Sequence, residues 1–268
     1  MRRDRAVAWA FLLLSCGGAR ATESGRVPVV APAKWELAWA DEFNGTSLDT
    51  TSWIANDGAS NVNNELQYYT PSEVYLENGA LVLRSQQRAM GGRAYTSGEV
   101  RSGAKHTVRM GNAIEWRTAS PSGKGIWPAN WLVNTPCDGL HGCGESWPPE
   151  IDVMEIRGSA PDVNLMTHWW RNPAGVQHET SEFAGNALST GYHTYRVEWF
   201  ADSIAWYVDG VQRAKHTSNI TTGVMQIVMN TAVGGDFDGA PSATTIFPQY
   251  QRIDYVRVYR DVANSYPQ

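Results

Sequence analysis

The 268-residue sequence contains few cysteines and no long hydrophobic segment. An apolar run from Ala6 to Leu14 is too short to cross a membrane, which takes about 20 apolar residues. The chain also lacks a Gly-x-Ser-x-Gly motif, a phosphate-binding loop and a dinucleotide-binding fingerprint. Its six histidines form no His-x-x-x-His pair, and its cysteines form no Cys-x-x-Cys pair. These absences exclude a transmembrane helix and argue against serine hydrolase, nucleotide-binding and zinc-finger classes.

The N-terminus has the features of an export signal. Arginines precede the apolar run, and Ala19-Arg20-Ala21 offers a cleavage site of the small-x-small type, which predicts a signal peptide over residues 1–21. In an alternative interpretation, Leu13-Leu14-Ser15-Cys16 is a lipoprotein signal and Cys16 is lipidated. We therefore expect a secreted or periplasmic protein, with a lipid anchor at Cys16 as the alternative.

The negative charge of the chain limits its partners. The formal net charge is −5, and residues 1–21 hold four arginines and one aspartate, a net of +3, so the remainder has −5 − 3 = −8. A negative surface repels nucleic acid, and the same argument disfavours heavily sulfated polysaccharides. Neutral sugars remain open as ligands. No nucleic acid partner is expected, and we expect a monomer.

Two cysteines, Cys137 and Cys143, remain after removal of residues 1–21. In an oxidising compartment, they are expected to form a disulfide that closes a short Gly-rich loop and contributes about 2 kcal/mol. The alternative is a pair of reduced, buried thiols.

The periodicity predicts an all-β fold. Apolar residues alternate over 195–199 and 204–208, and the turn pair Asp209-Gly210 follows, which predicts a hairpin. Residues 253–259 are apolar on both faces, which is typical of a central strand. No apolar pattern at helical spacing exceeds a turn or two, and no internal repeat is present. We predict roughly a dozen short antiparallel strands in two packed sheets, as in a jelly-roll β-sandwich.

Composition and periodicity also divide the chain into segments. Residues 22–34 are small, include proline and have no periodicity, so they are interpreted as a leader. One domain is predicted over residues 35–261, followed by a tail over 262–268.

Three acids lie within the six residues from Glu150 to Glu155. Side chains alternate along a strand, so Glu150 and Asp152 share one face while Ile151 and Val153 enter the core. One extra residue in a β-bulge would bring Glu155 onto the acidic face in place of Met154. Because three acids on one face repel one another, the arrangement suggests a function.

Glycoside cleavage needs such carboxyl groups. One ionised carboxylate attacks the anomeric carbon, and one protonated carboxyl donates to the leaving oxygen. Glu150 is the candidate nucleophile and Glu155 the candidate acid/base, while Asp152 would share a proton with Glu150. The competing interpretation is an exposed acidic strand edge or a calcium-binding surface.

Aromatic residues near these acids favour the catalytic interpretation. Flat apolar rings stack against the C–H faces of pyranose sugars, and polar neighbours bind the hydroxyls. The surrounding aromatic motifs are Trp127-Pro128-Ala129-Asn130-Trp131, Trp147-Pro148-Pro149 and His168-Trp169-Trp170.

The acidic segment resembles the signature of glycoside hydrolase family 16, which reads Glu, aliphatic, Asp, aliphatic, an optional aliphatic, Glu. The optional residue is present here as Met154, as in the laminarinases and the agar- and carrageenan-degrading relatives. Further segments resemble the laminarinase branch in order and spacing over residues 35–261. They are Trp39-Ala40-Asp41-Glu42-Phe43-Asn44-Gly45, Asn64-Glu65-Leu66-Gln67-Tyr68-Tyr69-Thr70, Tyr95-Thr96-Ser97-Gly98, Gly125-Ile126-Trp127-Pro128-Ala129, Ala232-Val233-Gly234-Gly235 and Asp254-Tyr255-Val256-Arg257-Val258-Tyr259.

This resemblance implies two curved antiparallel sheets with an open substrate cleft on the concave face, and a retaining mechanism that uses Glu150, Asp152 and Glu155. It also implies sugar contacts from Asn64, Trp127, Trp131 and His168. The alternatives for these four residues are core tryptophans, a turn asparagine and a hydrogen-bonded core histidine.

The resemblance further implies a structural calcium ion on the convex side. Its ligands would be Glu42, the carbonyl of Gly79 and Asp254, oxygen donors from distant parts of the chain. No cofactor is expected for catalysis.

The expected activity is endo-hydrolysis of a laminarin-type β-1,3-glucan. Alternatives are a hydrolase of mixed-linkage glucan or agar-type galactan, a transglycosylase, and a glucan-binding protein without activity. Three departures from the family pattern border the cleft: Pro149 replaces the usual Gly, residues 134–147 form a longer loop, and Glu99 stands where many relatives have Arg. Arg101 would serve in its place from the same strand face.

Overall fold

The computed structural model describes residues 32–138, 140–185 and 187–266. The predicted signal peptide, Cys16 and residues 22–31 of the predicted leader lie outside the described residues. Residues from Pro32 onward form one compact unit. No helix in this described part has the length and apolar character that a membrane crossing requires.

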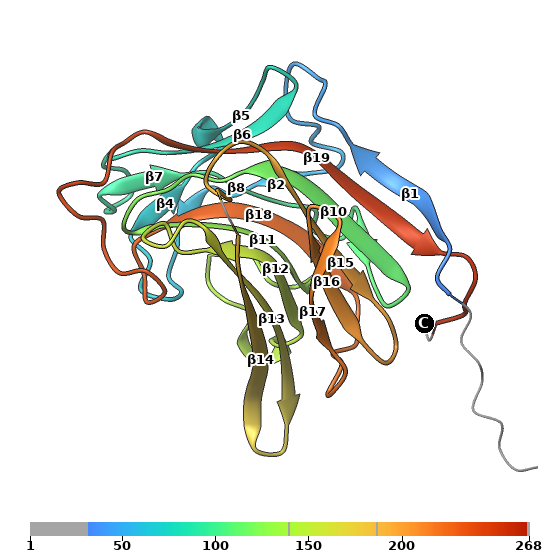
Figure 1. The fold of residues 1–268 in the computed structure, drawn as a ribbon. Helices are drawn as coiled ribbons and strands as arrows, with labels where there is room; N and C mark the ends of the chain where they lie inside the picture. The colour runs from blue at the N-terminus through green and yellow to red at the C-terminus, as the bar shows by residue number, and fades with distance from the viewer. Residues whose placement is uncertain (1–31, 139, 186, 267–268) are drawn as a thin grey trace, which may run out of the picture. The chain divides into compact units, whose positions relative to one another are not determined.

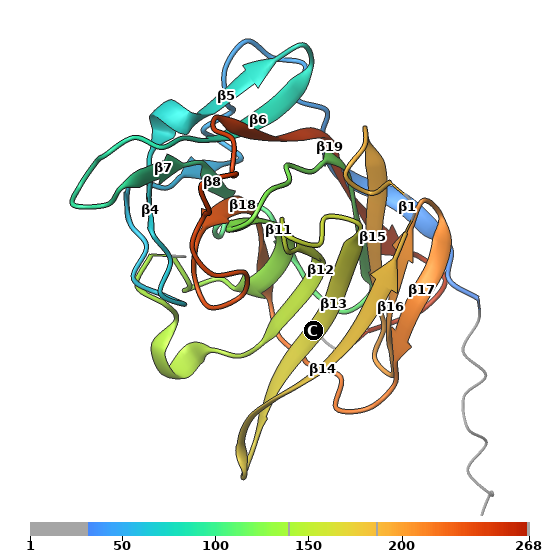
Figure 2. The same ribbon diagram turned by 60° about the vertical axis from the view of Figure 1, so that its left-hand side comes forward.

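Two large antiparallel sheets pack face to face (Figures 1 and 2). The back sheet contains, in spatial order, β17 (Val211–His216), β16 (Ile204–Val208), β15 (His193–Trp199), β10 (Asn112–Ala119), β19 (Gln249–Asp261), β6 (Ala80–Ser85) and β5 (Val74–Glu77), with β1 (Trp35–Asp41) also paired to β19. The cleft sheet, on which the site described below lies, contains β14 (Gly175–Ala184), β13 (Val163–Asn172), β12 (Glu150–Ile156), β11 (Ile126–Asn134), β18 (Met225–Val233), β8 (Glu99–Arg101) and β2 (Ile54–Ala55), with β9 (Thr107–Val108) beside β18.

A small third sheet joins β3 (Gly58–Ala59), β4 (Gln67–Tyr69) and β7 (Tyr95–Ser97), with β4 and β7 parallel. Two short 3-10 turns, η1 (Pro71–Glu73) and η2 (Gly144–Ser146), complete the described elements. The two-sheet, all-β architecture predicted from the periodicity is confirmed.

The predicted hairpin is formed by β16 and β17. Its turn residues, Asp209 and Gly210, have φ angles of 51° and 73°. Two positive φ values in a two-residue loop define a type I′ turn, whose twist matches that of the strands it connects. Asp and Gly are the residues that tolerate this conformation, which explains why the pair was recognisable in the sequence.

Strand β19 is central, as predicted, but its side chains do not alternate strictly. It pairs with β10 on one side, and the register shifts between Arg117 and Thr118, which lie opposite Tyr255 and Ile253. The extra residue is Asp254. Ile253 and Val256 are both fully buried, so the bulge brings both onto the core face.

Large aromatic side chains fill the space between the sheets. Trp116, Trp199 and Trp206 are each 0% exposed, and burial of each contributes about 2–3 kcal/mol. The indole Nε1 of Trp206 on the back sheet donates to the backbone oxygen of Asp152 on the cleft sheet, at 2.9 Å. The core therefore fixes the position of the acidic strand from behind.

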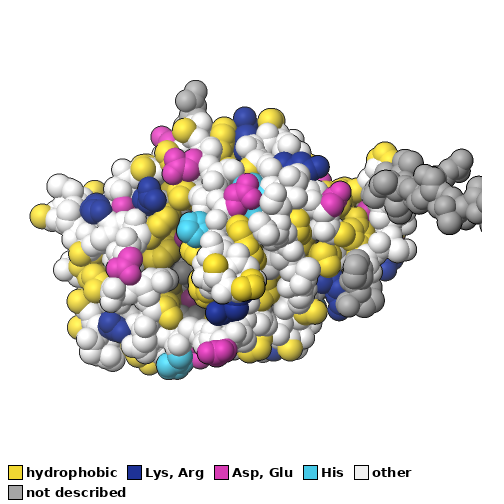
Figure 3. All heavy atoms as spheres, turned by 90° about the horizontal axis from the view of Figure 1, so that it is seen from below, with side chains coloured by type: hydrophobic (Ala, Val, Ile, Leu, Met, Phe, Trp, Pro, Cys, Tyr) yellow, Lys and Arg dark blue, Asp and Glu magenta, His cyan; other side chains and the backbone are white. Residues whose placement is uncertain are grey.

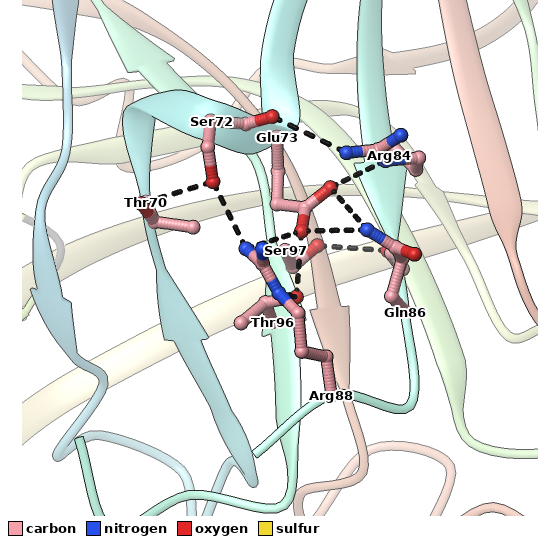
Figure 4. A network of polar contacts seen from close by, with 9 residues as sticks. Thr70, Ser72, Glu73, Arg84, Gln86, Arg88, Thr96 and Ser97 are labelled. Atoms are coloured by element: carbon pink, nitrogen blue, oxygen red, sulfur yellow. Dashed lines mark hydrogen bonds and ion pairs between the residues drawn. The ribbon is translucent and has the colours of Figure 1, made fainter. Parts of the chain in front are cut away.

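A buried ion-pair network fixes the turn before β5 (Figure 4). Glu73 is 0% exposed and accepts from Arg84 Nε at 2.5 Å, Gln86 Nε2 at 2.9 Å and Thr96 Oγ1 at 2.7 Å. Arg88 Nη2 lies 2.7 Å from the same carboxylate. Because these partners come from β6, the following loop and β7, one carboxylate ties three segments together.

We expect Glu73→Ala to lower the free energy of unfolding by about 3 kcal/mol, because it leaves two guanidinium groups without their buried anion. Thermal unfolding measures this as a fall in Tm of roughly 6–12 °C. The control is Glu36→Ala, which removes exposed pairs to Lys34 and Arg260 at 3.7 and 3.8 Å and should change stability by less than about 0.5 kcal/mol. Equal shifts for both variants would contradict the role given to Glu73.

Candidate active site

The three acids of β12 lie on one side of the cleft sheet because the strand contains a bulge. Opposite β13, Asp152 pairs with Thr167 and Glu155 pairs with Leu165, so three steps along β12 match two steps along β13. Ile151, Val153 and Met154 are buried in the core. The predicted phase change is therefore confirmed.

The side chain of Asn164 on β13 holds this bulge. Its Oδ1 accepts from the Glu155 backbone N–H at 3.0 Å, and its Nδ2 donates to the Val153 carbonyl at 3.1 Å. Asn164 is 0% exposed. Backbone groups that the bulge removes from the ladder thus find partners in one buried amide.

The acids open into a cleft of about 760 Å³. Side chains from three neighbouring strands line it with them: Trp127, Ala129 and Trp131 of β11, Leu165, Thr167 and Trp169 of β13, and His178, Thr180 and Glu182 of β14. The face seen in Figure 3 carries hydrophobic side chains around a hollow, with acidic and basic side chains interspersed. Such a mixture of apolar surface and a few polar groups is typical of a small-molecule or sugar site.

Each of the three carboxyl groups accepts a hydrogen bond from one tryptophan. The pairs are Trp147 Nε1 to Glu150 Oε2 at 2.9 Å, Trp169 Nε1 to Asp152 Oδ2 at 2.9 Å and Trp127 Nε1 to Glu155 Oε1 at 3.1 Å. An indole N–H is a donor only and has no charge. It therefore orients a carboxyl oxygen and stabilises its ionised form without neutralising it.

Burial raises the pKa of all three carboxyl groups. The pKa of Glu150 and of Glu155 is well above the usual value, and in each case the charge of Asp152 adds to the effect of burial. The pKa of Asp152 is raised to about 7 by burial, although hydrogen bonds from Trp169 and Glu150 oppose the shift. The site can therefore hold protonated and ionised carboxyls together near neutral pH.

Aromatic rings flank the acids at both ends of β12. Near Glu150, the ring centroids of Trp147 and Trp169 are 5.2 Å apart, and His178 lies 4.4 Å from Trp169. Near Glu155, Trp127 lies 4.7 Å from Phe237. Both ends thus offer flat apolar surfaces to a sugar ring.

The part of the cleft beyond β11 is polar. Trp131 donates through Nε1 to Asn230 Oδ1 at 2.9 Å, and Asn230 Nδ2 bonds the hydroxyl of Tyr69 at 2.9 Å. Glu99 lines this region and is 1% exposed, and burial raises its pKa well above the usual range. The suggestion that Arg101 replaces an arginine at position 99 is not supported, because Arg101 bonds Asn56 and does not line the cleft.

The structure places Trp127 and Trp131 in the cleft, but it contradicts the prediction for His168. Strand alternation puts Thr167 and Trp169 on the cleft face, so the intervening His168 faces the core, where it is 0% exposed. Its Nδ1 is hydrogen-bonded to Nδ1 of His216 on the back sheet, at 2.9 Å. His168 therefore does not contact a ligand in the cleft.

Asn64 is also outside the cleft lining. It has a positive φ of 54° and is exposed, and its Nδ2 donates to the two carboxylate oxygens of Asp236 at 2.9 and 3.1 Å. Its neighbours Asn63 and Glu65 line the cleft instead, together with Asp236. Asn64 thus fixes a lining residue rather than lining the cleft itself.

The arrangement of the predicted calcium ligands does not fit the ion. Both oxygens of Glu42 accept from Arg257, at 2.8 and 2.9 Å, and Asp254 pairs with Arg117 at 2.6 Å. Gly79 belongs to the turn between β5 and β6, with φ of 74°. Calcium needs several oxygen ligands with negative charge to spare, and here arginines already neutralise both carboxylates.

Cys137 and Cys143 form a disulfide, and both line the cleft. The loop between them is attached to the cleft sheet, because Gln226 Nε2 donates to the Cys137 carbonyl at 2.6 Å. The pairing considered from the sequence is therefore present, and it stiffens one wall of the site.

Sequence reasoning singled out the segments of Trp147 and Trp169 but not their role as donors to the acids. Side chains alternate along β13, so the neighbours His168 and Trp169 cannot both face the cleft. This alternation was a signal for Trp169. For Trp147, three residues before Glu150 and outside any strand, no signal in the sequence fixed the direction of the indole.

A β-sandwich whose cleft combines a group of carboxyls with aromatic walls is typical of carbohydrate-processing proteins, and the comparisons agree. Residues 59–257 match the model of glycosyl hydrolases family 16. The chain is 34% identical to glucan endo-1,3-beta-glucosidase A1 of Niallia circulans, over 86% of this chain but 39% of that protein. It is 31% identical to a beta-glucanase of Rhodothermus marinus, over 93% of this chain and 92% of that protein.

Among solved structures, the catalytic domain of an endo-1,3-beta-glucanase (laminarinase) from Thermotoga petrophila RKU-1 has a TM-score of 0.75 and 30% sequence identity. The similarity covers 86% of this chain and 100% of that one. The chain belongs to glycosyl hydrolase family 16, and its two sheets form the jelly-roll sandwich of that family. It spans well under half of the Niallia relative and nearly all of the Rhodothermus one.

The raised pKa of Asp152 predicts a pH-dependent loss of stability. A carboxyl whose pKa is higher in the folded state contributes stability below its unfolded pKa of about 4, and this is lost as pH rises through the folded pKa of about 7. Asp152→Asn cannot ionise and keeps an oxygen for Trp169. We expect it to melt above the wild type by several degrees, with the difference growing from pH 4.5 to pH 7.5.

Glu42→Gln is the control of opposite sign. The hydrogen bond from Arg257 lowers the pKa of Glu42, so its contribution is present above its unfolded pKa and lost as pH falls. This variant should melt below the wild type at neutral pH, with a smaller difference at acidic pH. A pH-independent difference for Asp152→Asn would refute the electrostatics given for the site.

Proposed function

We propose that this chain is a retaining endo-β-glucanase that hydrolyses a laminarin-type β-1,3-glucan. The proposal rests chiefly on one observation: three carboxyls on one strand face, Asp152 buried and the two glutamates half-buried, are each bound by an indole N–H and open into an aromatic-walled cleft. A retaining glycosidase needs one such carboxyl as nucleophile and another as acid.

In the first step, Glu150 attacks the anomeric carbon. Oε2 of Glu150 accepts a hydrogen bond from Trp147, so Oε1 is the oxygen that forms the bond to carbon. Glu155 donates its proton to the glycosidic oxygen, the C–O bond breaks, and the shortened glucan leaves with that proton. A covalent glycosyl ester on Glu150 and an ionised Glu155 remain.

In the second step, the ionised Glu155 removes a proton from water. The oxygen of that water attacks the anomeric carbon and displaces Glu150, which leaves as a carboxylate. Two inversions give a product with the configuration of the substrate. Trp127 donates to Oε1 of Glu155 and thereby stabilises the ionised form that exists between the two steps.

Asp152 serves as the proton partner of Glu150. The pair shares one proton, and Glu150 is ionised for attack in the state in which Asp152 holds that proton. The negative charge within the pair also raises the pKa of Glu155, which keeps the acid protonated before cleavage. In this account, Asp152 is a positioning residue, because it acts through the two glutamates.

The cleft and the relatives together favour a neutral glucan. The aromatic walls of the cleft suit the uncharged C–H faces of a sugar, and the net negative charge of the chain disfavours sulfated or carboxylated sugars. The three relatives are named as a glucan endo-1,3-beta-glucosidase, a beta-glucanase and an endo-1,3-beta-glucanase. The disulfide further suggests an oxidising compartment, so we also propose that the enzyme acts outside the cytoplasm.

The test is incubation of the wild type, Glu150→Gln, Glu155→Gln and the control Glu77→Gln, which lies on the hairpin before β6, with laminarin, mixed-linkage glucan and agarose. We expect the wild type and the control to release short oligosaccharides from laminarin, with retained anomeric configuration by NMR. Each active-site variant should lose about 1,000-fold or more in kcat/KM.

Other outcomes would replace the proposal. Cleavage of agarose alone would keep the mechanism and change the substrate. Longer products made from two substrate chains would indicate a transglycosylase. Binding of laminarin without cleavage would indicate a recognition protein, and inverted products would reject Glu150 as a nucleophile.

A further inference from the structure

Two buried histidines and one glutamate meet where an edge of the cleft sheet approaches an edge of the back sheet. His168 on β13 lies directly opposite Glu179 on β14 in the ladder, and His216 comes from β17. The histidines are 0% and 2% exposed, whereas the Glu179 side chain is 44% exposed. Thr167 and Trp169 face the cleft, so this cluster lies on the opposite side of β13 and has no part in the proposed glucanase activity.

The hydrogen bonds of the cluster leave its nitrogens only partly satisfied. The two Nδ1 atoms are 2.9 Å apart, so they share a single proton. The Nε2 atom of His216 lies 3.0 Å from Ser181 Oγ and 3.9 Å from a Glu179 oxygen. Nε2 of His168 is buried beside the backbone of Asn219 and Ser218, and it makes no hydrogen bond of good geometry there.

We propose that His168, His216 and Glu179 bind one transition-metal ion of the Zn²⁺ class. Each residue offers one ligand atom, and these atoms lie within 4.8 Å of one another. Ligands at bond lengths of about 2.0–2.2 Å are separated by about 3.0–3.5 Å at angles of 90–110°. The two imidazoles already have nearly this spacing, and the exposed Glu179 side chain is free to move toward them.

The chemistry of the three donors fits this class of ion. Imidazole with carboxylate suits Zn²⁺, Co²⁺, Ni²⁺ or Cu²⁺ rather than calcium or magnesium. Both histidines are buried, and burial favours the neutral imidazole, which is the form that binds metal. The ion would take the place of the proton that the two rings share, and Glu179 would offset part of its charge.

The position of the cluster gives the ion a structural role. His216 packs against Trp206 with ring centroids 4.6 Å apart, and Trp206 donates to the backbone of Asp152. Trp170 stacks on His168 at 4.8 Å and closes another side. A bound ion would join the two sheets at an edge directly behind the acidic strand, and it would stabilise the folded chain because the unfolded chain has no such site.

The experiment uses untagged protein freed of metal by a chelator. Titration with Co²⁺, read by its visible d–d absorption, should give one saturable site per chain, and saturating Zn²⁺ should raise Tm. Glu179→Gln and His216→Gln should each weaken binding by about tenfold or more. Glu179→Gln is the variant that keeps the core intact, because its side chain is half-exposed.

His141→Gln is the matched control. His141 forms an exposed pair with Asp138 at 2.8 Å, the kind of surface site that binds metal weakly, and its loss should leave the cobalt spectrum and the Zn²⁺ shift unchanged. The proposal is overturned if no saturable spectrum appears, or if Glu179→Gln and His216→Gln both bind as the wild type does. Because every readout is metal binding, these results do not depend on glucanase activity.

Discussion

One extra residue in strand β12 places a third carboxyl group in the cleft, and the proposed chemistry depends on it. In a regular strand, Met154 would face the cleft and Glu155 would face the core, where an unpaired carboxylate costs several kcal/mol. The bulge leaves backbone groups without ladder partners, and the buried amide of Asn164 satisfies two of them. A single asparagine on the neighbouring strand thus supports the geometry of the whole site.

Burial and hydrogen-bond partners together decide the acidity of the carboxyl groups. Glu42 is bound by an arginine on both oxygens, and its pKa is lowered. Glu155 has an indole N–H instead, with burial and the charge of Asp152 acting on it, and its pKa is raised. A neutral donor orients a carboxyl while leaving it able to hold a proton, whereas a guanidinium keeps it ionised. This difference separates a group suited to acid catalysis from one that only stabilises the fold.

Features set by local sequence were the predictable ones. The Asp209-Gly210 turn needs two positive φ angles, which Asp and Gly tolerate. The bulge in the acidic strand was predictable because only an extra residue places all three acids on one face. The two large sheets followed from turn spacing and alternation. These features depend on residues that are close together in the sequence, so the sequence alone was enough to predict them.

Features set by tertiary contacts were not predictable. His168 was expected in the cleft, but the register of β13 turns it toward a histidine 48 positions away. Asn64 was expected to contact sugar, yet a positive φ turns it toward Asp236. Glu42 was expected to bind calcium, but its carboxylate accepts a hydrogen bond from Arg257 of the last strand, 215 positions away. In each case the outcome depended on a distant partner that no local pattern identifies.

The most direct test of this account is the pH–rate profile of Trp127→Phe on laminarin, beside the matched variant Trp131→Phe. The hydrogen bond from Trp127 lowers the pKa of Glu155, so its removal should raise that pKa and shift the alkaline limb of kcat/KM to higher pH. Trp131 donates to Asn230 and not to an acid, so its variant should leave the limb in place. An unshifted limb in Trp127→Phe, or equal shifts in both variants, would contradict the claim that the indole of Trp127 tunes the acidity of Glu155.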